Sequence, residues 1–182
     1  DCASLKVLNN ANGETLLIIL LTHLKSRLDP ERIDPGGVER RSAELRTCVD
    51  IYKETAALFP NTAIIFAGDM NGYAGKIKTD AEFNLIYQET DLEDVLELAN
   101  ISNEKRSTFY QIKNNNKVEG KQIDYCFISK HLHDKIVKEQ TYVYRYKDEF
   151  GFALEQPRNL DEKLRLPSDH YPLFFSLEKL LF

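Results

Sequence analysis

The stretch TAIIFAGDMN, residues 62–71, joins an apolar run directly to a polar turn. An apolar run without alternation is typical of a strand that is covered on both faces. We therefore predict a buried strand over residues 62–67, ended by Gly68. Loops just beyond such strands collect the catalytic groups of α/β folds. Asp69 and Asn71 are thus candidate functional residues, although an ordinary turn would use the same residue types.

Strands and helices are expected to alternate along the rest of the chain. Apolar runs at residues 5–8 and 16–21 flank an Asn-Gly turn, which predicts a hairpin whose second strand is also covered on both faces. After a polar loop over residues 25–37, apolar residues recur at helical spacing from Leu45 to Ala56, and Pro60 ends this helix. The remaining expected elements are short helices at 81–87, with Asp80 as N-cap, and at 92–98, and strands at 122–128, 141–146 and 173–175. This alternation predicts an α/β or α+β fold with mixed sheets.

Composition narrows the class of protein. A chain of 182 residues suits one domain, and 42% hydrophobic with 29% charged residues excludes a disordered or collagen-like chain. The longest apolar run has six residues, far short of the roughly 20 that cross a bilayer. Cys2, Cys48 and Cys126 lack metal-ligand spacing and are odd in number, so free, mostly buried thiols are expected, which favours a reducing, intracellular compartment. A net charge of −5 neither favours nor excludes a polyanionic partner.

Histidine and aspartate recur where apolar runs end. His170 is the side chain best suited to proton transfer near neutral pH, and it needs a carboxylate to fix its tautomer. Asp124, beside a predicted buried strand, is the candidate partner, because a carboxylate there is costly unless paired. His23 follows the most apolar strand, yet each of these histidines, taken alone, is equally explained as a structural residue. His131 and His133 have the spacing of a metal pair but lie in a charged, surface-like segment, so we expect no metal there.

Four motifs in this order resemble the endonuclease/exonuclease/phosphatase superfamily, the deoxyribonuclease I-like fold. They are THLKS at residues 22–26, GDMN at 68–71, IDY at 123–125, and SDH at 168–170 followed by Pro172. The segment RSTFY at residues 106–110 also matches the family's run before the third motif. The resemblance covers essentially the whole chain. It implies a four-layered α/β sandwich with two packed mixed sheets and a Mg²⁺- or Mn²⁺-dependent phosphoesterase.

The resemblance also implies roles for individual residues. Asp69 would position or deprotonate the attacking water and lie beside the metal. Asp169 would also lie near the metal. Asn71 would hold the scissile phosphate, and His23 would serve as a second acid or contact the phosphate. His170, oriented by Asp124, would act as a general base or clamp a phosphate oxygen.

One family residue has no counterpart here. The family's main metal ligand is a glutamate in an upstream strand, and nothing before His23 matches it, since Glu14 falls in the hairpin turn. We therefore expect residues 1–182 to be a single domain that represents the C-terminal two-thirds of the family fold. This piece would be weak or inert alone, whereas the longer protein would be active.

The substrate stays open at this level. Basic residues in the loop 25–41 suit either a phosphate-contacting rim or a solvated mixed-charge loop, and Tyr142, Tyr144 and Tyr146 suit sheet packing better than base stacking. The first hypothesis is a nuclease acting on nucleic acid. The second is a phosphatase or sphingomyelinase-like enzyme acting on lipid or inositol phosphates. A sphingomyelinase-like enzyme tends to need an exposed apolar hairpin for membranes, and the sequence indicates none, which argues against it. The third is a catalytically inert interaction module of the same fold, favoured by the absent glutamate but opposed by the intact set of polar residues.

Overall fold

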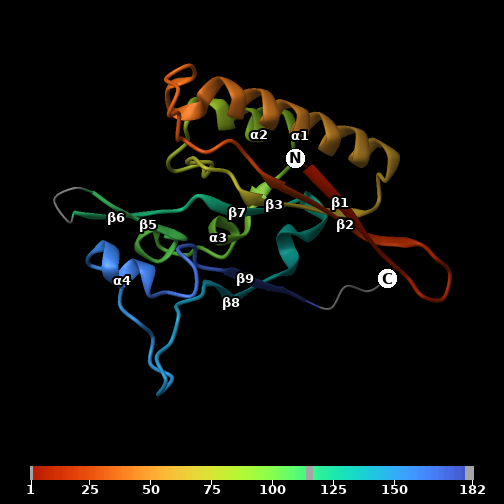
Figure 1. The fold of residues 1–182 in the computed structure, drawn as a ribbon. Helices are drawn as coiled ribbons and strands as arrows, with labels where there is room; N and C mark the ends of the chain where they lie inside the picture. Colours follow the sequence, from red (N-terminus) through yellow and green to blue (C-terminus); the bar gives the residue numbers. More distant parts are fainter. Residues whose placement is uncertain (1, 114–116, 179–182) are drawn as a thin grey trace.

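A five-stranded mixed sheet forms the centre of the molecule (Figure 1). The computed structural model describes residues 2–113 and 117–178. The sheet has the order β1 (Cys2–Leu8), β2 (Thr15–His23), β3 (Ala63–Asp69), β7 (Asp124–Ile128) and β4 (Glu93–Asp94). Strands β2 and β3 are parallel, and every other neighbouring pair is antiparallel. The predicted hairpin and the mixed sheet are confirmed.

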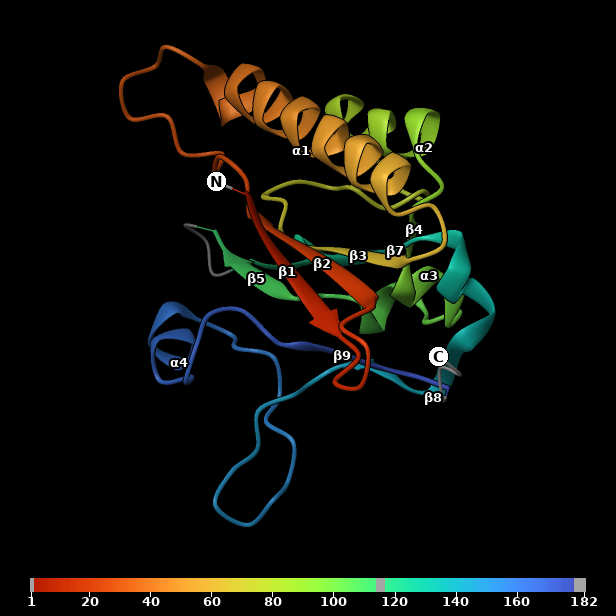
Figure 2. The same ribbon diagram turned by 90° about the vertical axis from the view of Figure 1, so that its right-hand side faces the viewer.

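Helices cover one face of this sheet (Figure 2). They are α1 (Val38–Leu58) and α2 (Asn84–Glu89). Their apolar side chains pack on alternate residues of the central strands, among them Ile64, Phe66 and Phe127. Because side chains alternate across a strand, the residues between them face the other way. The uninterrupted apolar runs thus supply two separate cores.

Smaller elements cover the opposite face. They are α3 (Val95–Leu98), the antiparallel pairs β5 (Phe109–Ile112) with β6 (Val118–Lys121) and β8 (Ile136–Val143) with β9 (Leu173–Leu177), and α4 (Leu160–Leu164). The second core joins Ile65, Cys126 and Ile128 of the central sheet to α3, β8 and β9. The α/β sandwich is therefore present. Within the described residues its second strand layer consists of two antiparallel pairs rather than one mixed sheet.

Several predicted boundaries shift, each for a local reason. The helix expected from Leu45 begins at Val38, directly after the loop that ends at Gly37. The helix expected at 92–98 is instead strand β4 followed by one helical turn, because the Asp94 carboxylate accepts the Leu96 N–H and starts the helix there. The strand expected at 141–146 runs from Ile136 to Val143. Asp80 does lie before a short 3₁₀ turn, but its carboxylate accepts the Tyr73 N–H instead of capping that turn.

Gly68 lies inside strand β3 and does not end it, contrary to expectation. Its φ is +150°, and a Cβ there would lie 1.8 Å from the Thr22 carbonyl oxygen. Only glycine permits this approach of the β2 and β3 backbones. The strand therefore continues to Asp69, which stands opposite His23 in the parallel register.

The elements that cover the sheet face opposite α1 and α2 do not extend as far as the edge strand β1. Leu5, Val7 and Leu21, which share that face by register, are 53%, 44% and 40% exposed. The prediction that the strand over residues 16–21 is covered on both faces is therefore wrong at its outer end.

An apolar hairpin also protrudes, which the sequence did not indicate. Lys147 and Ala153 pair across it, and Phe150 and Phe152 at its tip are 76% and 71% exposed. The three cysteines are free, as predicted, with Cys48 and Cys126 buried. None of the helices in the described part of the chain has the length and apolarity needed to span a bilayer.

Candidate active site

Three neighbouring strands bring polar side chains to one edge of the central sheet. Strands β2 and β3 end at His23 and Asp69, and the antiparallel β7 begins at Asp124. The register pairs His23 with Asp69, and Asp69 with Asp124. Three of the predicted residues therefore stand side by side in one row, because of strand pairing alone.

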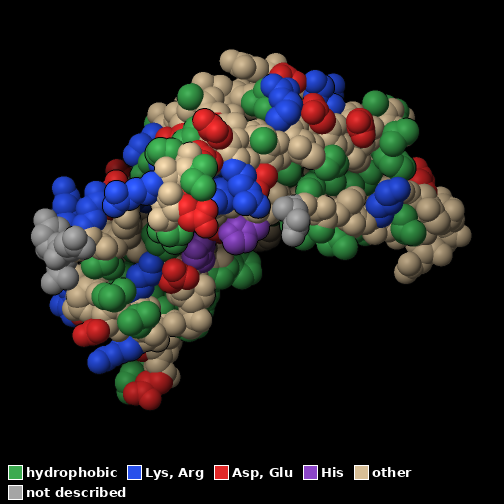
Figure 3. All heavy atoms as spheres, turned by 45° about the horizontal axis from the view of Figure 1, so that its top comes forward, with side chains coloured by type: hydrophobic (Ala, Val, Ile, Leu, Met, Phe, Trp, Pro, Cys, Tyr) green, Lys and Arg blue, Asp and Glu red, His purple; other side chains and the backbone are tan. Residues whose placement is uncertain are grey.

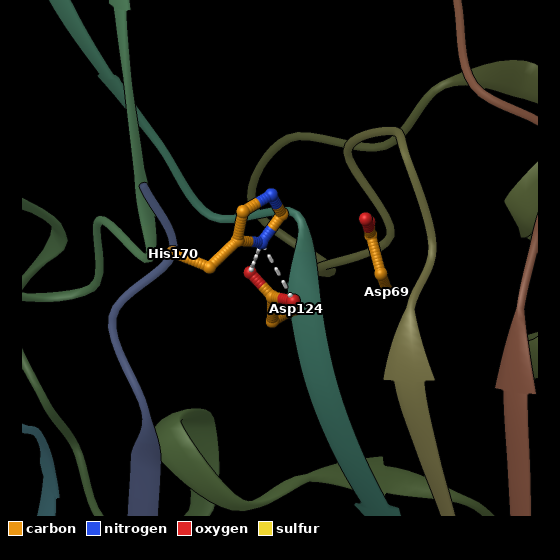
Figure 4. A group of neighbouring side chains, drawn as sticks. All are labelled: Asp69, Asp124 and His170. Atoms are coloured by element: carbon orange, nitrogen blue, oxygen red, sulfur yellow. Dashed lines mark hydrogen bonds and ion pairs between the residues drawn. The ribbon is translucent and has the colours of Figure 1, made fainter. Parts of the chain in front are cut away.

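His170 joins this row through its hydrogen bond to Asp124 (Figure 4). Its Nδ1 lies 2.9 Å and 3.1 Å from the two carboxylate oxygens of Asp124. An ionised carboxylate can only accept, so Nδ1 carries the proton and donates it, and Nε2 of a neutral ring is left as an acceptor. This hydrogen bond raises the pKa of the His170 imidazole, against the opposing effect of its partial burial. The predicted pairing of Asp124 with His170 is therefore observed.

The backbone around this pair is held at several points. The Thr108 hydroxyl oxygen accepts the backbone N–H of Asp124 at 3.1 Å, which fixes the start of β7. Phe109 pairs with His170 in an isolated antiparallel bridge, and their rings lie 5.2 Å apart between centroids. The Tyr146 hydroxyl donates to the His170 carbonyl at 2.8 Å. The position of the imidazole is thus fixed by contacts to its partner Asp124, to the face of its own ring and to the backbone of His170.

Asp69 is the most enclosed carboxylate of the row. Its side chain is only 18% exposed, and burial together with the charge of Asp124 raises its pKa, while the Asn71 N–H opposes this effect. That N–H donates to the Asp69 carboxylate at 2.8 Å. His23 is largely exposed, and its Nε2 lies 3.6 Å from the second carboxylate oxygen. Two like charges facing each other favour a bound cation or a bound proton.

Asn71 is held in the left-handed region, with φ of +52°. Its side-chain amide nitrogen donates to the Leu24 carbonyl at 2.9 Å, which ties the loop after β3 to the loop after β2. An amide nitrogen carries two N–H groups, so the second stays available for an acceptor such as a phosphate oxygen. The phosphate-holding role given to Asn71 and His23 remains a prediction.

Three groups lie close enough to share one metal ion. Ligand atoms of Asp69, Asp124 and His170 all lie within 4.8 Å of one another, the one such group among the described residues. Asp169 is not part of this group: its carboxylate is 56% exposed and pairs with Lys163, whose Nζ lies 3.4 Å away. Asp169 nevertheless belongs to the electrostatic surroundings of the site, since its charge helps to raise the pKa of His170. Its role as a metal ligand stays a prediction.

Sequence reasoning missed one residue of this neighbourhood. Lys163, in the short helix α4, is only 12% exposed and places Nζ 3.7 Å from the centroid of the Phe109 ring, which itself packs on His170. Nothing local in the sequence indicates this contact, because α4 and β5 are distant along the chain. His131 and His133 lie outside the group of three. His133 bonds to the Ile128 carbonyl, and Tyr142 and Tyr144 pack on Phe174 of β9.

Solved structures share this architecture. The chain is similar to TDP2 from D. rerio in complex with a single-strand DNA product, at 21% identity and TM-score 0.54, over 91% of this chain and 58% of that one. It is also similar to an endonuclease/exonuclease/phosphatase family protein from Bacteroides thetaiotaomicron, at 17% identity and TM-score 0.54, over 96% and 54% of the two chains. A mannosyl-6-phosphatase from the same bacterium matches at 18% identity and TM-score 0.54, over 97% and 56%. No family model and no curated protein matches the sequence.

The chain spans about half the length of the solved structures that it matches. At these identities the likeness concerns the fold, and it agrees with the expectation drawn from the four motifs. His23, Asp69 and Asp124, with His170 bonded to Asp124, bring one residue from each of the four motifs together at the ends of the central strands. This chain has the fold of the endonuclease/exonuclease/phosphatase superfamily.

Proposed function

We propose that this chain carries the reaction centre of a metal-dependent phosphoesterase that hydrolyses phosphodiester bonds of nucleic acid. The observation that carries the proposal is the Asp124–His170 pair lying beside the half-buried Asp69 carboxylate. A single-strand DNA product in the related TDP2 structure supports nucleic acid as the substrate. A positioned imidazole and a carboxylate supply the proton transfers that such a hydrolysis needs.

The donor set fits a hard divalent cation. Asp69 and Asp124 are paired in the strand register and have ligand atoms within 4.8 Å of each other and of the His170 ring, and carboxylate oxygens are the ligands that Mg²⁺ and Mn²⁺ prefer. We propose Asp69 as a direct ligand and Asp169 as a second carboxylate near the ion. Such an ion would neutralise charge on the phosphoryl oxygens and lower the pKa of the attacking water.

The protein groups have separate tasks in this proposal. Asp69 orients the attacking water from its place in the row. His170 accepts a proton at Nε2 or holds a phosphate oxygen there, while Asp124 stabilises the imidazolium that forms. Asn71 donates its second amide N–H to the scissile phosphate. The exposed His23 contacts the phosphate or supplies a proton to the leaving oxygen.

A further ligand is proposed from outside residues 1–182. The apolar side chains left exposed near the β1 edge, Leu5, Val7 and Leu21, suit cover by additional chain of the same domain. We propose that an upstream strand supplies both this cover and a glutamate ligand. In that case the present residues form the C-terminal two-thirds of the domain, and the longer protein is the fully active form.

The test is cleavage of a labelled single-stranded oligonucleotide with Mg²⁺, with and without EDTA. We expect cleavage that EDTA abolishes and that His170→Ala reduces by about 10²- to 10⁴-fold, the usual contribution of a general acid or base. The matched control is His131→Ala, which removes an exposed histidine outside the group of three. If residues 1–182 prove inert, the same comparison is made in the longer protein. An inert longer protein would contradict the proposal and favour an interaction module.

A second candidate substrate is a phosphodiester in a lipid headgroup. It is favoured by the hairpin whose Phe150 and Phe152 are exposed at the tip. Aromatic side chains are able to enter a membrane interface, but Asp148 and Glu149 beside them disfavour an anionic surface. Hydrolysis of sphingomyelin vesicles that exceeds hydrolysis of the oligonucleotide, and that Phe150→Ser reduces, would favour this candidate instead.

A further inference from the structure

Basic side chains gather around one aromatic ring beside the reaction centre. Measured to the centroid of the Tyr73 ring, Nζ of Lys78 lies at 3.6 Å, Cζ of Arg27 at 5.7 Å and Nζ of Lys121 at 6.0 Å. The three cations come from the loop after β2, the turn after β3 and the end of β6. On the face drawn in Figure 3, Lys and Arg side chains gather beside the His side chains. Basic side chains from three chain segments thus meet around the Tyr73 ring.

This basic cluster, defined as Arg27, Lys78 and Lys121 around Tyr73, has an excess of positive charge. Arg27 pairs with Asp80. Within residues 2–113 and 117–178, neither Lys78 nor Lys121 has a carboxylate oxygen within 4.0 Å. Burial lowers the pKa of the Lys121 ammonium, and the charges of Arg27 and Lys78 lower it further, against the effect of Glu119. The cations therefore repel one another, and an anion bound between them would relieve that repulsion.

Two short chain segments and one hydrogen bond connect the basic cluster to the catalytic row. Tyr73 follows Asp69 by four residues, and Lys121 precedes Asp124 by three, a separation that an extended chain spans in at most about 10 Å. Arg27 also donates from Nε to the Asn71 carbonyl at 3.1 Å, which couples the cluster to the loop that carries Asn71. Successive phosphates of a stretched nucleic-acid strand lie within such a distance of one another.

A hollow of about 440 Å³ opens on the same side, and Tyr73 and Lys78 belong to its wall. Its wall also holds amide and hydroxyl groups of Asn103, Gln122 and Ser107, the Arg106 guanidinium and the carboxylates of Glu97 and Glu119. This volume lies in the range of sites that take small organic ligands. A nucleoside attached to a phosphate at the basic cluster could occupy it.

We propose that Lys78 and Lys121, held at Tyr73, form a second phosphate site for the nucleotide next to the scissile bond. The substrate class is then a single strand with at least two consecutive phosphates, rather than an ester with one phosphate. This inference rests on the proposed function, since it takes the Asp124–His170 centre as the place of cleavage. Tyr73 serves as the platform that positions the lysine ammonium groups.

The test is equilibrium binding of a fluorescein-labelled ten-nucleotide single strand, measured by anisotropy in EDTA at several salt concentrations. Each lost phosphate contact makes the slope of log K against log salt shallower by about 0.7 for a single strand. We expect the double variant Lys78→Gln, Lys121→Gln to lose about 1.4 from this slope. The control variant Lys138→Gln, Lys147→Gln, which removes two exposed lysines outside the cluster, keeps the original slope. An unchanged slope in the first variant, an equal loss in the control, or no measurable binding overturns the proposal.

Competition with the labelled strand distinguishes an oligonucleotide from an inositol phosphate as the source of two phosphates. We expect the dinucleotide pTpT to displace the labelled strand at lower concentration than thymidine monophosphate, and this preference to disappear in the Lys78, Lys121 variant. A lysine-dependent preference for inositol 1,4-bisphosphate over pTpT would overturn the oligonucleotide assignment.

The two proposals fail separately because binding is measured without metal. Lysine-dependent binding without any hydrolysis would contradict the proposed function alone. Hydrolysis without lysine-dependent binding would contradict the second phosphate site alone.

Discussion

The chemistry of the site depends on which nitrogen of His170 carries the proton. Because Nδ1 donates to the Asp124 carboxylate, the ring is fixed both in orientation and in tautomer. The hydrogen bond also favours the protonated ring, so Asp124 adjusts the basicity of His170 as well as its position. Asp69 does not share this hydrogen bond, and its own pKa is raised chiefly by burial. Two neighbouring carboxylates therefore have different tasks because they have different partners.

Replacing Asp124 should lower the pKa of His170. The Asp124→Asn variant keeps the shape of the side chain but removes the charge that stabilises the imidazolium, so the ring should release its proton at lower pH. The measurement is a pH titration of the His170 ring signals by NMR in EDTA. Asp50→Asn, which removes an exposed carboxylate on α1, should leave the titration unchanged. An unshifted His170 titration in Asp124→Asn would contradict the assigned pairing.

At this scale the sequence predicted the Asp124–His170 pair but not what surrounds it. The pairing of His170 with Asp124 could be predicted because a carboxylate beside a buried strand and a proton-transferring imidazole each need a partner. The packing of Phe109 on His170 and of Lys163 on Phe109 could not be predicted, because these segments are distant in sequence and ordinary in composition. Long-range packing of this kind leaves no periodic signal along the chain.

Among the elements, the pairing of β2 with β3 places the row of catalytic side chains. Gly68 allows this pairing, since its missing side chain makes room for the Thr22 carbonyl oxygen. Gly68→Ala would add a Cβ 1.8 Å from that oxygen, and the backbone of β2 cannot retreat without losing its hydrogen bonds to β3. We expect the free energy of unfolding to fall by about 3 kcal/mol or more, as urea denaturation would measure.

Gly13→Ala is the matched control for this substitution. Gly13 has φ of +71°, but a Cβ there meets nothing within 4 Å. It should therefore cost only the left-handed conformation, about 1–2 kcal/mol. Equal losses in the two variants would contradict the view that the close approach at Gly68 is the larger effect.

Elements built from uninterrupted apolar runs were predictable, and those set by a single polar contact were not. Strands β2, β3 and β7 follow apolar runs that favour burial, so their existence came directly from the pattern. Residues 92–98 have the spacing of a helix, yet Asp94 ends a strand pairing and begins one turn at the same point. A capping contact at one residue thus overrides a weak periodicity.

For the molecule as a whole, the second core faces a buried acidic group. Asp94 is fully buried, accepts hydrogen bonds from Leu96 and from the Gln122 side chain, and lies 4.0 Å from Nη1 of Arg106. Burial raises the pKa of its carboxyl to about 7, above the ordinary value near 3.8. The folded protein therefore holds a proton on Asp94 over a pH range in which the unfolded chain has already released it.

This difference sets the sign of a pH dependence. Between about pH 4 and pH 7 the folded state binds more protons than the unfolded state, so stability should fall as pH rises through that window. The raised pKa values of Asp69 and His170 act in the same direction. For Asp94 alone the loss would amount to at most about 4 kcal/mol, since each unit of pKa corresponds to about 1.4 kcal/mol.

The Asp94→Asn variant should remove most of this dependence. Its amide oxygen still caps the turn at Leu96, and Gln122 needs only to rotate its own amide to offer an acceptor to the new N–H group. Urea denaturation at pH 4.5 and pH 7.5 should then give a smaller difference in stability than in the unchanged protein, while Asp50→Asn keeps the original difference. If Asp94→Asn and the unchanged protein instead show the same difference in stability between pH 4.5 and pH 7.5, Asp94 is ionised in the fold, and Arg106 holds it as a buried ion pair.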